Sequence, residues 1–189
     1  MCCRMKLFAT LVMLALGARS ASAGELDLDL GLQATTTGWP DDHGGGAALA
    51  ATWLIRPWIG ASFIGKEQYA KVDDRFMSYF SFNAVLRHAL GPLRLTGSLG
   101  LVHQHEEPRA AVMEQPFGSL FGVGDGIRHR MGERAGISLA LPVKTHGHGD
   151  YYVAFDLDGT MFMDTDKGPH WMTSAGLSVG FTYDFARTK

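Results

Sequence analysis

The sequence predicts an all-β protein, an eight-stranded antiparallel up-and-down transmembrane β-barrel. The first observation is that apolar and polar residues alternate with a period of two over many segments, as in strands with one apolar and one polar face. The second is the length of these segments: Trp171–Phe185 matches a tilted strand crossing a bilayer in about 9–11 residues, whereas soluble strands usually have about 5–6. The third is the high content of glycine, 24 residues, which suits many turns.

The N-terminal 23 residues have the pattern of a secretory signal peptide. Arg4 and Lys6 form a positive n-region, Leu7–Leu16 is a short apolar h-region, and residues 21–23 are a small-residue cleavage site. We therefore expect residues 1–23 to be removed on export and residues 24–189 to form the barrel domain.

The expected mature chain, starting near Gly24, is acidic. Cys2 and Cys3 leave with the leader, so no disulfide is expected. Loss of the leader's three basic residues leaves 14 Lys and Arg against 19 Asp and Glu, a net charge of −5 with neutral histidines. This balance argues against a nucleic-acid partner, which requires a basic surface. No cofactor is expected.

The first strand, Glu25–Thr35, is the most regular: leucines alternate with acidic residues, Gly and Gln. A helix would scatter those leucines around its circumference, so the strand assignment is favoured. The next three strands are expected at Ala47–Arg56, Ile59–Lys66 and Phe76–Arg87. Pro57 ends the second, because proline cannot continue a hydrogen-bonded ladder. The expected connections are a breaker-rich loop at 36–46, a turn at 56–58, a charged loop at 67–75 and a turn at 88–92.

The alternation stops after the fifth strand, Leu93–His103. Gln104–Gly132 is expected as one long loop, in which Pro108–Gln115 can form a helical turn. A structureless loop of this length indicates function or a wrong assignment. The competing assignment makes 119–130 a further strand, which would give an odd count of nine.

The last three strands are expected at Arg134–Lys144, Tyr151–Met163 and Trp171–Phe185, joined by a turn at 146–149 and a loop at 164–170. In the last strand one face carries Ala, Leu, Val and aromatic residues, and the other carries mostly Ser, Gly and Thr. A small, polar inner face suits a narrow barrel filled by side chains.

The alternation of short and long connections is typical of outer-membrane barrels, with short periplasmic turns and longer external loops. In this pattern the chain resembles the small eight-stranded outer-membrane barrels of the OmpA and OmpX type. The last strand is also similar to their C-terminal signature, which closes on an aromatic residue, here Phe185, although four residues follow it. The resemblance implies a bacterial outer-membrane location with lipid as the surrounding partner. A soluble lipocalin-like barrel, with its apolar face turned inward, is the alternative.

If the leucines face lipid, a set of acidic and basic residues faces the lumen. Arg56, Arg87, Arg94 and Lys144 are expected near the short-turn end, close to Glu25 and Asp27. Buried charges require partners, so the set is interpreted as a salt-bridged plug, with a charge-lined ion path as the alternative. The predicted lumen set is Glu25, Asp27, Asp29, Arg56, Arg87, Arg94, Lys144, Asp156, Asp158 and Asp184.

Two weak candidate sites lie at the external end. Histidines offer ligands for a divalent metal, and His103 and His105 share a face of an extended chain, but no HExxH spacing is present. The weak metal candidates are His43, His103, His105, His129 and His170. A lipid-modifying enzyme would need a nucleophile, a base and an acid; His103, Glu106 or Glu107, and Ser119 are the residues available, without a nucleophile elbow.

The sequence therefore favours a non-catalytic outer-membrane barrel, mostly plugged, acting in envelope integrity or in surface recognition through its external loops. The external segment 104–132 is the expected contact for an extracellular ligand or envelope partner. A lipid-modifying enzyme (acyl hydrolase or transferase), a small pore and a metal-binding surface protein are the alternatives.

Overall fold

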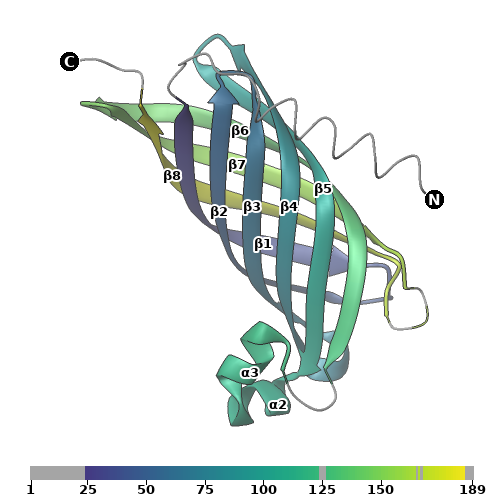
Figure 1. The fold of residues 1–189 in the computed structure, drawn as a ribbon. Coiled ribbons are helices and arrows are strands. Elements are labelled where there is room, and N and C mark those ends of the chain that lie inside the picture. The colour runs from purple at the N-terminus through teal and green to yellow at the C-terminus, as the bar shows by residue number, and fades with distance from the viewer. Residues whose placement is uncertain (1–23, 124–126, 165, 167, 186–189) are drawn as a thin grey trace.

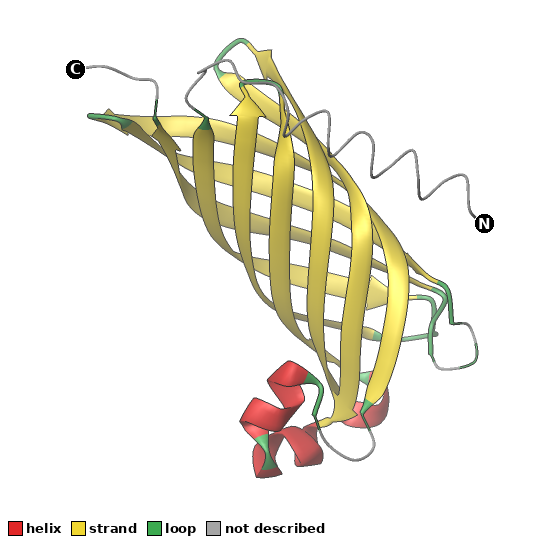
Figure 2. Ribbon diagram, viewed as in Figure 1, coloured by secondary structure: helices red, strands yellow, loops and turns green. Residues whose placement is uncertain are grey.

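The computed structural model describes residues 24–123, 127–164, 166 and 168–185, with only the backbone at 119 and 120. The expected signal peptide, 1–23, lies outside the described residues. The chain forms one closed barrel in which every strand pairs antiparallel with its neighbours in sequence, and the last strand pairs with the first (Figures 1 and 2). The strands are β1 (Glu25–Thr37), β2 (His43–Arg56), β3 (Ile59–Ala70), β4 (Arg75–Leu90), β5 (Leu93–Pro108), β6 (Arg128–His146), β7 (Gly149–Phe162) and β8 (Trp171–Asp184). The predicted eight-stranded antiparallel barrel is confirmed.

The apolar face of the sheet points outward. Leu32 on β1 is 74% exposed and Leu177, its partner on β8, is 69% exposed. Polar side chains on the alternate positions, such as Asp27 and Thr182, are buried inside the barrel. An exposed apolar wall around a polar interior is the reverse of a soluble barrel and matches a barrel surrounded by lipid. The lipocalin-like alternative, which needed the leucines inside, is therefore wrong.

The two ends of the barrel differ. At the short-turn end lie the first and last strand residues, Glu25 and Asp184, which pair with each other, and the tight turns at 57–58, 91–92 and 147–148. Gly91 and Gly147 have positive φ, a conformation that glycine adopts without steric cost. The opposite, long-loop end carries the remaining connections and the helices α2 (Arg109–Glu114) and α3 (Pro116–Phe121), which lie beside the end of the barrel (Figure 1).

The strands extend further toward the long-loop end than predicted. His43–Gly46 belongs to β2, Glu67–Ala70 to β3 and Gln104–Pro108 to β5, so the expected loops at 36–46, 67–75 and 104–132 are too long. The glycines at 44–46 suggested a loop, but in the structure they allow β2 to pack closely on β3. A Cβ at Gly46 would overlap the Glu67 carbonyl oxygen. Near this end both faces of β5 carry polar residues, so alternation no longer marks the strand.

The connection between β5 and β6 contains the predicted helical turn, since α2 lies within 108–115. The competing strand at 119–130 is wrong: residues 119–121 belong to α3 and β6 begins at Arg128. A short 3-10 helix, η1 (Val72–Asp74), joins β3 to β4. In the described part of the chain, no helix is long and apolar enough to cross a membrane.

Candidate functional site

The interior near the long-loop end is centred on the carboxylate of Glu106. This group contacts Arg130 at 3.1 Å, Arg128 at 3.2 Å and Arg75 at 3.5 Å. Glu106, Arg75 and Arg130 are fully buried. A buried charge is tolerated when oppositely charged, hydrogen-bonding groups surround it, so this cluster of one acid and three guanidinium groups is a fixed element of the interior.

A second carboxylate, Asp42, continues this cluster. Its Oδ2 atom lies 2.6 Å from Arg75 Nη2, and its Oδ1 accepts a hydrogen bond from the Val72 N–H. Burial raises the pKa of Asp42, but the hydrogen bonds from Arg75, Thr37 and Val72 outweigh burial and hold the pKa below its usual range. The Asp42 carboxylate therefore ties β1, η1 and β4 together at the barrel rim.

Further into the barrel from the Glu106 cluster, Asp158 pairs with two cations. Lys66 Nζ lies 2.7 Å from its carboxylate and Arg134 Nε lies 3.4 Å away. Arg134 also donates a 2.7 Å hydrogen bond to the Ser98 hydroxyl. These contacts join β3, β5, β6 and β7 across the interior.

In the short-turn half, Arg87 pairs with Asp27 and, at 3.1 Å, with Glu25. Arg94 donates a 2.7 Å hydrogen bond to Thr182, and Tyr152 donates one to Asp29. Arg87 and Arg94 lie near Glu25 and Asp27, as expected. A cavity of about 90 Å³ is lined by members of this group, including Asp29, Arg87 and Arg94. A second, of about 240 Å³, is lined by Arg87, Arg94 and Asp184 among others and lies at the short-turn mouth.

Two residues predicted to face the lumen lie elsewhere. Arg56 and Lys144 are exposed at the short-turn end. The strand register shifts between Leu54 and Arg56 on β2 and between Pro142 and Lys144 on β6. Such bulges change which face the following residue occupies. The other predicted lumen residues are buried or half-buried on the inner face; Asp156 accepts a 2.7 Å hydrogen bond from Ser178.

Sequence reasoning missed several interior charges because it assigned them to loops or strand ends. Arg75 and Arg130 were placed in loops, although Arg130, Gly132 and Arg134 continue the inner face of β6. The signal available was the period of two counted back from Arg134, inside the predicted strand, to Arg130. The missed interior charges are Asp42, Lys66, Arg75, Glu106, Arg130 and Arg134.

The candidate catalytic residues lie on both faces of the barrel wall. Glu106 lies inside the barrel among arginines, whereas His103 lies three positions earlier on β5 and on the outer face. Glu107 shares the outer face with His103 and is buried. The side chain of Ser119 lies outside the described side chains. The sheet therefore separates Glu106 from His103.

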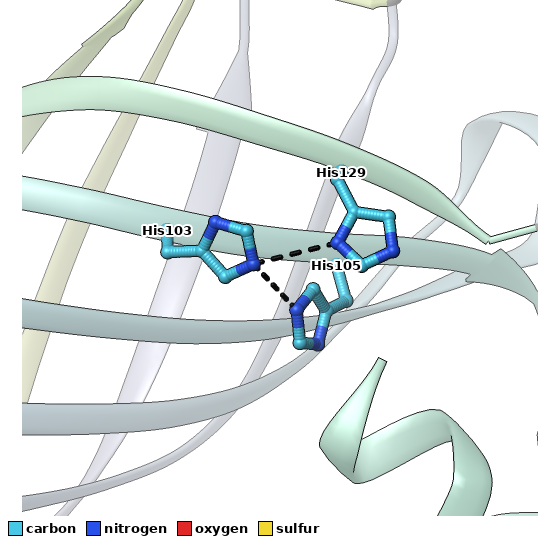
Figure 3. A group of neighbouring side chains, drawn as sticks. All are labelled: His103, His105 and His129. Carbon is cyan, nitrogen blue, oxygen red and sulfur yellow. Dashed lines mark hydrogen bonds between the residues drawn. The ribbon is translucent and has the colours of Figure 1, made fainter. Parts of the chain in front are cut away.

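Three histidines do converge, on the outer wall near the long-loop end (Figure 3). His103 and His105 lie on the same face of β5, and His129 on β6 is directly opposite His105 in the strand register. His105 Nε2 lies 2.7 Å from His103 Nε2, and His129 Nδ1 lies 3.4 Å from the same atom. The other metal candidates, His43 and His170, are exposed and outside this group.

The histidine cluster is partly covered from outside the barrel. His105 is only 5% exposed although it points away from the lumen. A Cβ at Gly122 would overlap the His105 ring, so the backbone after α3 packs directly on that imidazole. The ring of Phe80 on β4 meets His105 edge-on with centroids 5.9 Å apart. The cluster thus lies between the sheet and the α3 end of the connection.

A closed eight-stranded antiparallel barrel with an apolar outer wall and a charged interior has the fold of the small outer-membrane β-barrel proteins. No family model and no curated protein matches the sequence. Among solved structures, Neisserial surface protein A superposes with a TM-score of 0.60 at 11% identity, covering 88% of this chain and 100% of that one.

Two further barrels are similar. OprG from Pseudomonas aeruginosa gives a TM-score of 0.51 at 11% identity, covering 87% of this chain and 97% of that one. Ail, the attachment invasion locus protein of Yersinia pestis, gives 0.50 at 14% identity, covering 85% and 98%. The resemblance to small outer-membrane barrels is confirmed at the level of fold.

Proposed function

We propose that this protein is a bacterial outer-membrane barrel, closed by its own interior side chains, that acts without catalysis by presenting its long-loop end outside the cell. The observation that carries the proposal is the Glu106 cluster with three arginines. The apolar wall and the similarity in fold to outer-membrane proteins support the location.

The interior network supports a closed lumen because it crosses the barrel at successive levels. Glu106 and Arg130 lie near the long-loop end, Lys66 and Asp158 further in, and Arg87 and Asp27 toward the short turns. Moving the Glu106 or Asp158 carboxylate aside to let an ion pass would leave buried cations, such as Arg130 or Lys66, without that partner, which is costly. The cavities of the short-turn half lie below the Glu106 cluster.

The connection between β5 and β6 supports a role in surface recognition. Met113 on α2, Phe117 and Phe121 on α3, and Val123 after it are each more than two-thirds exposed. Exposed apolar side chains gathered on one segment are typical of an interaction site. Two of the similar structures are described as a surface protein and an attachment protein. The segment 109–127 is therefore the proposed contact for an envelope or host-surface partner.

Planar-bilayer recording tests the closed lumen. The folded protein should give no single-channel steps. A variant in which the paired acids and bases of all three levels are replaced by Ala, checked for folding, should give them. Regular steps from the unaltered protein would contradict closure and favour the small-pore alternative.

A loop-exchange variant tests the recognition role. Replacing 110–126 with a short Gly-Ser linker should leave the barrel folded and abolish the attachment of expressing cells to a partner surface. Undiminished attachment would place recognition elsewhere. As a check on the enzyme alternative, lipid A and phospholipid masses in the host membrane should be the same with and without expression.

A further inference from the structure

The imidazoles of His103, His105 and His129 meet on the outer wall of the barrel, apart from the interior network. We infer that they form a binding site for one divalent transition-metal ion of borderline softness, with Zn²⁺ as the representative ion. The inference does not depend on whether the lumen is closed.

The first argument is the convergence of three ring nitrogens on one point. The ligand atoms all lie within 4.8 Å of one another, and His103 Nε2 faces both His105 Nε2 and His129 Nδ1. A neutral imidazole has one N–H and one lone pair. His103 Nε2 can therefore make a full hydrogen bond with His105 or with His129, but not with both. A cation between the rings would accept all three lone pairs together.

The second argument is the spacing of the nitrogens. Zn–N distances of about 2.0–2.1 Å in tetrahedral geometry place neighbouring nitrogens roughly 3.3 Å apart. The two separations from His103 Nε2, 2.7 Å and 3.4 Å, lie on either side of that value, and all three ligand atoms lie within 4.8 Å of one another. The cluster is therefore of the size that one such ion requires.

The third argument is that the ligands stand on a rigid support. His103 and His105 are two residues apart on β5, and His129 is register-paired with His105 on β6, so the ladder sets the Cα positions. Functional groups on strands are held more precisely than groups on loops. The second nitrogen of His103 lies 3.0 Å from Met131 Sδ, and Phe80 packs on His105; such surrounding contacts orient metal ligands.

The ligand type indicates the class of ion. Three imidazoles suit Zn²⁺, Ni²⁺ and Cu²⁺, whereas Mg²⁺ and Ca²⁺ prefer oxygen ligands. His129 is exposed, which leaves a side open for ion entry and for water as a fourth ligand. A three-histidine set with one open position is a known zinc arrangement.

Titration of the metal-free protein tests the site. The chain is prepared without a polyhistidine tag, folded in detergent, stripped with chelator and titrated with Zn²⁺ against a chromogenic competitor. We expect one equivalent to bind. Co²⁺ in place of Zn²⁺ should give the visible absorption of a four-coordinate complex.

Single variants locate the ligands. His129→Ala, at the exposed position, should weaken Zn²⁺ binding by more than the about 10–100-fold that loss of an outer partner typically costs. His103→Ala and His105→Gln should do the same, and His43→Ala and His170→Ala, outside the cluster, should bind as the unaltered protein does. Heat-dependent gel mobility confirms that each variant is folded.

Any of three results would overturn the inference. The first is Zn²⁺ binding by the triple variant His103→Ala, His105→Gln and His129→Ala equal to that of the unaltered protein. The second is equal weakening by His43→Ala and His129→Ala, which would indicate scattered surface binding. The third is the absence of any bound equivalent in the folded protein.

Discussion

Glu106 on β5 and Arg130 on β6 form an ion pair of 3.1 Å inside the barrel, and neither side chain is exposed to solvent. They are separated by the whole α2–α3 connection in sequence. The pair thus links the ends of β5 and β6 where the α2–α3 connection leaves the barrel.

Replacement of Glu106 with Gln should destabilise the barrel strongly. The change leaves Arg75 and Arg130 buried without their shared carboxylate, and removal of one partner from a buried ion pair costs about 3–5 kcal/mol. Unfolding by urea from lipid vesicles measures the free energy of unfolding of each variant. Glu114→Gln, at an exposed position on α2, is the control and should change stability little; equal effects of the two variants would contradict a structural role for the cluster.

The two partners of the central pair should differ in their effects. Asp158→Asn leaves both Lys66 and Arg134 without an anion, whereas Lys66→Met leaves Asp158 still paired with Arg134. We expect Asp158→Asn to cost about 3–5 kcal/mol and Lys66→Met less, because an unpaired buried charge carries the larger penalty. Unfolding in urea gives the order, and the reverse order would show that Arg134 does not compensate.

Two glycine substitutions should act in opposite directions. Gly46→Ala should destabilise by about 1–3 kcal/mol, because the new methyl group overlaps the Glu67 carbonyl oxygen and forces β2 from β3. Gly97→Ala meets no atom closer than 4.0 Å and should stabilise by about 0.4–1 kcal/mol through the unfolded state. Comparable stabilities of the two variants would contradict the close β2–β3 packing.

Stability should depend on pH through Asp42. The folded-state pKa of Asp42 lies below its usual range, and the unfolded value is about 3.9. Its contribution is therefore fully present above about pH 4 and is lost as pH falls through the folded-state pKa. Unfolding measured across acidic pH should show this loss, and Asp42→Asn should remove it. Asp41→Asn, at the exposed neighbour, should leave the profile unchanged.

Most of the barrel could be predicted from residues such as Leu28, Leu30 and Leu32, because a lipid-facing wall requires an apolar side chain at every second position. The ends of the strands on the long-loop side could not be predicted in this way. There the outer face carries His103, His105 and Glu107, so both faces are polar and the period of two disappears from the composition while the ladder continues.

The interior and the histidine cluster depend on register. Arg87 and Arg94 were predicted correctly in the lumen, whereas Arg56 and Lys144 were not, because bulges at 54–56 and 142–144 leave no clear mark in the sequence. The shared face of His103 and His105 follows from spacing. Their contact with His129 depends on the register in which β5 pairs with β6. The sequence alone does not specify that register, because a helical connection separates the two strands.

The most direct test of the account is the accessibility of the α2–α3 connection on intact cells. Met113→Cys, at a position 78% exposed on α2, should react with a membrane-impermeant thiol reagent, while His146→Cys at the opposite, short-turn end should react only after the cells are opened. The unaltered chain sets the background. Labelling of His146→Cys but not Met113→Cys on intact cells would contradict an outer-membrane barrel that presents this connection outside.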